Sequence, residues 1–152
     1  MRKPYFQPVP GSPAPLRMIV KRRVRFEEVD SMGIVWHGRY AGYFEDARVA
    51  LGHKYDISYS DFISHRNPVP IRQINIEYIE PLFFEDDIEI EAILHWSEAA
   101  RINFEYIIRK NGNIVCVGYT VQLMLDENLE LLLAPTPFYL DFMEKWKKGL
   151  LA

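Results

Sequence analysis

A change in the spacing of apolar residues constrains the fold of this chain more than any other feature. Between residues 40 and 51, apolar side chains recur every three or four positions, as on one face of an amphipathic helix. Glu45, Arg48 and Lys54 fall off this stripe. Further along, the interval becomes two, which indicates half-buried antiparallel strands. These alternating runs are 74–78, 88–96 and 102–108.

Turn residues place further elements around this helix. Asn111-Gly112 is typical of a two-residue hairpin, so we expect another strand over 114–125. A first strand is predicted over 18–29 and a short helix within a loop near 59–64. A sheet must bury the apolar stripe of the long helix. The chain is therefore predicted to be α+β, with a curved antiparallel sheet wrapped around one long central helix.

The two ends of the chain differ from the middle. Thr136 is a good helix cap, Pro137 suits a first helical position and Gly149 can end the last helix. Half of the ten prolines lie among the first 15 residues, where helix and central strand are disfavoured. We expect a proline-rich arm over 1–17, extended or mobile, and a single domain over 18–152.

Composition excludes several classes of protein. The 152 residues suffice for one domain, and 49% apolar content excludes a mainly disordered chain. A net charge of −3 gives no reason to expect nucleic acid as a partner, and no apolar run is long enough for a membrane span. The single cysteine, Cys116, favours a reducing compartment, so we expect the cytoplasm.

Few side chains outside one segment suggest chemistry. The four histidines have no spacing typical of a metal site, and neither a metal nor a cofactor is expected. Ser31 and Cys116 are conceivable nucleophiles, but Cys116 lies inside a strand pattern and is better explained as a structural thiol. The remaining segment is 30–40, between the first strand and the long helix. Asp30 either forms a turn with Gly33 or uses its carboxylate near the helix start, where free N–H groups can stabilise an oxyanion.

The sequence Asp30-Ser-Met-Gly-Ile-Val-Trp-His-Gly-Arg-Tyr40, followed by Tyr43-Phe44-Glu45 and Arg48, closely resembles the 4-hydroxybenzoyl-CoA thioesterase-like family. The resemblance is specific over 20–55, looser over 67–126, and finds no counterpart for the arm. It implies a hotdog fold and an acyl-CoA thioesterase that releases a free acid and CoA without a cofactor. It also implies a homodimer or homotetramer.

The resemblance also implies roles for individual residues. Asp30 would be the catalytic nucleophile or general base, and the N–H of His37 would polarise the thioester carbonyl at the N-terminus of the central helix. The His37 side chain either assists or only forms hydrogen bonds. Gly38, Tyr40 and Arg101 would contact the substrate, although Tyr40 also suits ordinary core packing.

One stretch departs from the family pattern. Some members carry several basic residues just after the tryptophan that ends the third strand. In this chain, Arg101 is the only basic residue among the five that follow Trp96. A different phosphate clamp or an acyl carrier protein as donor is therefore possible, as is a non-catalytic acyl-thioester-binding subunit. Another basic cluster, 21–25, is either such a clamp or a solvated strand edge. A hydratase is a rival within the fold.

Overall fold

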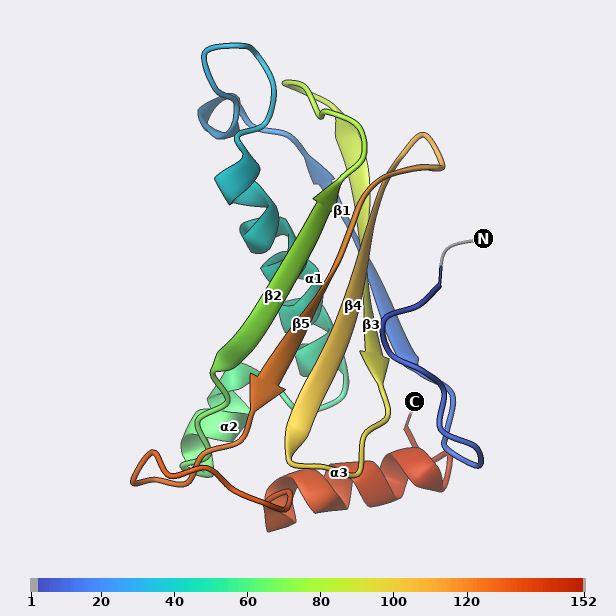
Figure 1. Ribbon diagram of the computed structural model, residues 1–152, viewed down its shortest axis with the longest axis vertical. Helices are drawn as coiled ribbons and strands as arrows, with labels where there is room; N and C mark the ends of the chain where they lie inside the picture. The colour runs from blue at the N-terminus through green and yellow to red at the C-terminus, as the bar shows by residue number, and fades with distance from the viewer. Residues whose placement is uncertain (1–2, 152) are drawn as a thin grey trace.

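A computed structural model describes residues 3–151 and contains one antiparallel sheet with three α-helices (Figure 1). The strands are β1 (Leu16–Arg23), β2 (Ile71–Tyr78), β3 (Asp87–His95), β4 (Arg101–Lys110) and β5 (Asn113–Leu123). The helices are α1 (Tyr40–Lys54), α2 (Tyr59–Ser64) and α3 (Pro137–Lys147). The strands lie in the order β1-β3-β4-β5-β2, so β1 and β2 form the two edges of the sheet.

The sheet curves around α1, whose apolar stripe forms the centre of the core (Figure 1). Phe44 on this stripe is fully buried and stacks on Tyr106 of β4, with the ring centres 4.4 Å apart. Gly118 of β5 leaves room for the Phe44 ring, because a Cβ there would lie 2.6 Å from it. The predicted α+β hotdog architecture is confirmed.

Arg48 corrects one detail of the helix prediction. It does not lie outside the buried face: its side chain is only 7% exposed and packs in the core. Its guanidinium donates hydrogen bonds to the hydroxyls of Tyr59 and Tyr106, each over 2.9 Å. A buried cation is tolerated when its donors are satisfied in this way. The acceptors come from distant parts of the chain, so the local pattern could not reveal them.

The first strand is shorter than predicted at its C-terminal end. It stops at Arg23 and is followed by a 3₁₀ turn, Phe26–Glu28. The Glu28 carboxylate accepts a hydrogen bond from the N–H of Arg25 over 2.7 Å, which closes this turn. A side chain that bonds its own backbone in this way competes with strand pairing, so the prediction of a strand to residue 29 is wrong.

The other local predictions hold. Asn111 and Gly112 both have positive φ angles, 52° and 79°, as a two-residue hairpin turn requires. The α2 helix lies at the expected position, over 59–64. The Thr136 hydroxyl accepts a hydrogen bond from the N–H of Tyr139 and caps α3.

The N-terminal arm folds back onto the domain. The Tyr5 ring lies parallel to Tyr119 of β5, with ring centres 3.7 Å apart. The indole N–H of Trp146 in α3 donates to the carbonyl of Ala14 over 3.0 Å. β1 begins at Leu16, within the range expected for the arm. No helix among residues 3–151 is long and apolar enough to cross a membrane.

Candidate active site

The segment between β1 and α1 forms a small hairpin, residues 28–36, called the Asp30 hairpin below. Val29 and Val35 pair across it in an antiparallel bridge. At its tip, Gly33 has a φ of +81° and donates its N–H to the carbonyl of Asp30 over 3.0 Å. A positive φ is easy for glycine and costly for other residues, so this glycine makes the tight turn possible.

Asp30 has the turn-forming role that its sequence context suggested. Its Oδ1 accepts a hydrogen bond from the N–H of Met32 over 2.8 Å, and its own N–H donates to the carbonyl of Ile34 over 2.8 Å. Its side chain is half-buried, and no hydrogen bond to Oδ2 is found among residues 3–151. The turn therefore occupies one carboxylate oxygen and leaves the other available for chemistry.

Backbone donors lie at the start of the long helix. A 3₁₀ turn, His37–Arg39, leads into α1, with the N–H of Arg39 bonded to the carbonyl of Trp36 over 2.9 Å. In the part of the chain that the structure describes, the N–H groups of His37 and Gly38 have no acceptor. Such groups carry the positive end of the helix dipole and favour a developing negative charge.

A pocket of about 360 Å³ brings the carboxylate and the helix start together. Asp30, His37 and Tyr40 line it, as do two residues that the sequence did not single out, Tyr78 and Glu80. The Tyr78 hydroxyl donates to the carbonyl of His37 over 2.9 Å, which ties the end of β2 to the start of the helix. In the sequence, nothing marks Tyr78 as a site residue except its place at the end of the alternating run 74–78.

Tyr40 has both of the roles considered for it: it lines the pocket and is buried in the core. Its ring meets that of Tyr78 edge to face, with centres 4.8 Å apart. Burial raises the pKa of Tyr40 to about 12, so its hydroxyl is protonated at neutral pH. It can therefore shape the pocket or donate a hydrogen bond, but it cannot act as a base there.

Gly38 and Arg101 do not line this pocket. A Cβ on Gly38 would lie 2.3 Å from the Trp36 ring, so glycine lets that indole close over the helix start. Arg101 is the first residue of β4, which begins near α3, at the opposite end of the domain from the start of α1 (Figure 1). Substrate contacts by these two residues stay predictions.

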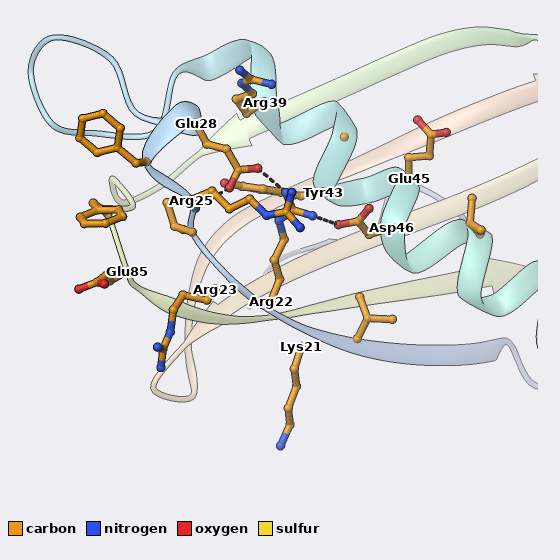
Figure 2. Close-up of a pocket in the computed structure, with 16 residues that line it drawn as sticks. Lys21, Arg22, Arg23, Arg25, Glu28, Arg39, Tyr43, Glu45, Asp46 and Glu85 are labelled. Carbon is orange, nitrogen blue, oxygen red and sulfur yellow. Dashed lines mark hydrogen bonds and ion pairs between the residues drawn. The ribbon is translucent and has the colours of Figure 1, made fainter.

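A second and larger groove, of about 980 Å³, lies between β1 and α1 (Figure 2). The basic cluster over 21–25 contributes to it, but three of its four cations are paired with carboxylates, Arg25 with the neighbouring Glu27 over 3.8 Å. Arg22 bonds to Glu28 and, over 2.6 Å, to Asp46, whereas Arg23 bonds to Asp87 over 2.9 Å. The Arg22 side chain is only 23% exposed, so it is not part of a solvated strand edge.

The remaining candidate groups show no second centre of chemistry. Cys116 is fully buried in β5, which fits a structural thiol, and Ser31 is exposed at the tip of the Asp30 hairpin. Within residues 3–151, no group of three or more His, Cys, Asp or Glu side chains is arranged to hold a metal ion.

Comparison with known proteins extends these observations. The model of the thioesterase-like superfamily matches residues 24–145. A provisionally named esterase of Aquifex aeolicus is 33% identical over 107 residues, which cover 70% of this chain and 84% of the relative. The acyl-CoA thioester hydrolase YbgC of Escherichia coli is 29% identical over 69 residues, 45% of this chain and 52% of that protein.

Solved structures give the same fold. The crystal structure of a DHNA-CoA thioesterase from Staphylococcus aureus superposes with a TM-score of 0.78 and 24% sequence identity. The match covers 88% of this chain and 90% of that one. At this identity the likeness supports the architecture alone. The N-terminal arm lies outside the residues that the superfamily model matches.

Proposed function

This chain belongs to the thioesterase-like superfamily, and from that premise we propose that it hydrolyses acyl-CoA thioesters to a free acid and CoA. One observation carries the proposal: the Asp30 carboxylate and the start of the long helix line the same small pocket. A carboxylate and unpaired N–H donors are what acyl transfer from a thioester needs. We also retain the narrower 4-hydroxybenzoyl-CoA thioesterase-like assignment as part of this proposal.

In the proposed mechanism, Asp30 acts in one of two ways. As a general base, its free oxygen takes a proton from water while the water oxygen attacks the thioester carbon. As a nucleophile, the same oxygen attacks the carbon, releases CoA thiolate and forms an anhydride that water then hydrolyses. In both cases the C–S bond breaks, and the thiolate becomes CoA thiol after protonation.

The helix start would stabilise the charge that forms on the carbonyl oxygen. The N–H of His37 has no competing acceptor in the described chain, and the Tyr78 hydroxyl fixes the His37 carbonyl on the other side. Donors that are held in place before reaction need not reorganise as charge develops. The His37 imidazole also borders the pocket, where it can bond the substrate.

We propose that the active unit is a homodimer or a homotetramer. β2 is an edge strand, and several large apolar side chains on it or directly after it are about half exposed. These are Ile74 (45%), Tyr78 (49%) and Ile79 (52%). An exposed apolar strand edge favours pairing with a second copy. We propose the cytoplasm as the compartment, since a single cysteine, buried in β5, cannot form a disulfide within the chain.

The decisive experiment incubates the pure protein with a panel of acyl-CoA esters of different chain length and aromaticity, in the presence of a thiol reagent. Release of one thiol per acid formed is the expected result. Binding without thiol release would instead identify a non-catalytic subunit, and a changed acyl chain without release would identify a hydratase. Activity on acyl carrier protein thioesters but not on CoA esters would identify the carrier protein as the donor.

A further inference from the structure

We propose that Glu28 is a positioning residue, which holds the Asp30 hairpin in register with the start of α1 and thereby sets the turnover rate. This inference rests on the proposed thioesterase function. Glu28 does not line the Asp30 pocket, so it acts through the hairpin and not on the substrate.

The Glu28 carboxylate lies in an environment that is unusual for a charged group. The residue is only 3% exposed, and its carboxylate accepts hydrogen bonds from the Arg22 guanidinium and from the N–H of Arg25. Burying a charge is costly unless the charge is paired and hydrogen-bonded, and here it is both. The carboxylate is thus fixed from two sides, and the backbone that carries it is fixed with it.

Arg22 extends this contact to the long helix. Its second terminal nitrogen, Nη1, bonds to Asp46 of α1 over 2.6 Å, and its guanidinium lies over the Tyr43 ring, 5.1 Å from the centre (Figure 2). One planar guanidinium therefore joins β1, α1 and the base of the Asp30 hairpin. Arginine suits this task because its donors form a rigid fork.

Both strands of the hairpin connect Glu28 to groups of the proposed site. The Glu28 carbonyl accepts the N–H of Trp36 over 2.9 Å, directly before His37. On the strand that carries Glu28 itself, Asp30 lies two residues further on, past the bridge between Val29 and Val35. Glu28 is therefore bonded to the residue before the His37 donor and lies two positions from Asp30. The His37 N–H and the Asp30 carboxylate are the two groups that act together in the proposed mechanism.

The second strand of the hairpin has a separate attachment, so we expect the fold to survive loss of the Glu28 anchor. The N–H of Val35 donates to the carbonyl of Leu82 over 2.8 Å, and Ile34 bridges to Phe83. Neither contact involves the Glu28 side chain. Loss of the anchor should therefore shift the hairpin relative to α1 without unfolding it. A displacement of about 1 Å can cost on the order of 10²-fold in rate.

The test is Glu28→Gln, which keeps the shape of the side chain but removes its charge. We expect kcat for the best acyl-CoA ester to fall at least about 10-fold with KM little changed, since alignment and not substrate affinity is lost. Amide hydrogen exchange should become faster at Trp36, whose N–H donates to the Glu28 carbonyl, but not in β3. Arg22→Lys, which cannot hold Glu28 and Asp46 with one planar group, should act in the same direction and replaces Glu28→Gln if that variant does not fold.

A matched control is Asp87→Asn. Asp87 pairs with Arg23, the neighbour of Arg22 on β1, but both side chains are exposed and their hydrogen bonds join them to each other and not to the Asp30 hairpin. The same acid-to-amide change there should leave kcat and the exchange of the hairpin amides unchanged.

Three outcomes would overturn the proposal: an unchanged kcat in Glu28→Gln, unchanged exchange at the hairpin, or faster exchange throughout the domain, which would mean general destabilisation. Failure of the proposed function is distinct from these, because the wild-type protein itself would then release no thiol. In that event the exchange experiment still decides whether Glu28 anchors the hairpin.

Discussion

Asp30 has a structural role in its turn and, in the proposed mechanism, a chemical role as well, and the two can be separated by substitution. In Asp30→Asn, the amide oxygen can still accept the N–H of Met32 and preserve the turn. The substitution removes the negative charge, and with it the nucleophile or base. We expect kcat to fall on the order of 10²–10⁴-fold with little change in melting temperature. A well-folded variant with near-normal kcat, measured by thiol release, would rule out the proposed mechanism.

The lowered pKa of Glu28 also leads to a prediction of how stability depends on pH. Burial opposes ionisation of this carboxyl, but the Arg25 N–H and the Arg22 guanidinium outweigh it and lower its pKa. A group with a lower pKa in the folded state stabilises the protein above its unfolded pKa, about 4.5. This contribution is lost as the pH falls through the folded-state pKa.

The free energy of unfolding should therefore decline below about pH 4.5, and it should decline less steeply in Glu28→Gln. Urea unfolding of both proteins between pH 3 and pH 7 measures the difference. Asp61, whose pKa is also lowered, chiefly by its hydrogen bonds with Ser58, keeps part of the dependence in both proteins. Identical pH dependence in the two proteins would contradict this account of Glu28.

At the scale of elements, two glycines test how tightly the sheet wraps α1. A Cβ on Gly118 of β5 would lie 2.4 Å from the Asn75 carbonyl oxygen and 2.6 Å from the Phe44 ring. The carbonyl belongs to the neighbouring strand and cannot move without disturbing the sheet. Gly118→Ala should therefore destabilise the fold by about 1–3 kcal/mol, the usual cost of overpacking.

Gly42 is the matched comparison, because it faces open space on α1. Alanine at a helical position without a clash should stabilise the protein by about 0.5–1 kcal/mol. Thermal unfolding of both variants should therefore shift in opposite directions, by about 2–4 °C per kcal/mol for a chain of this size. A shift in the same direction would show that the close approach of β2, β5 and α1 is wrong.

For the whole molecule, we predict that the arm contributes to stability and not to catalysis. It contacts Tyr119 on β5 and Trp146 on α3, neither of which lines the Asp30 pocket. Deleting residues 1–15 should leave thiol release nearly unchanged. The loss of the Tyr5 stacking, worth about 0.5–1.5 kcal/mol, should lower the melting temperature by a few degrees. A large loss of activity with normal helicity would mean that the arm enters a site.

Assembly is the second property of the whole molecule that can be tested directly. The exposed edge strand β2 and the half-exposed apolar side chains on it or directly after it predict an even number of subunits. Light scattering at micromolar concentration should give a multiple of twice the 17.9 kDa chain mass. A species that stays at 17.9 kDa across that range would contradict the prediction.

The sequence by itself determined the features that depend on near neighbours. The stripe over 40–51 predicted α1, period-two runs predicted β2 to β4, and Asn111-Gly112 predicted the hairpin before β5. The cap of α3 followed from Thr136 in the same way. Periodicity and capping are set within a few residues, so they can be read from a linear sequence. Asp30 was also found from its local context, together with the resemblance to a known family.

Only the tertiary structure decided which distant groups meet. Tyr78 reaches His37 across 41 positions, Arg48 reaches Tyr106 across 58, and Arg22 reaches Asp46 across 24. Each contact depends on the order of the strands and on how the sheet curves, which local spacing does not encode. For the same reason the sequence could name Asp30 but not the Glu28 anchor, since a buried carboxylate is explained only by the distant guanidinium that balances its charge.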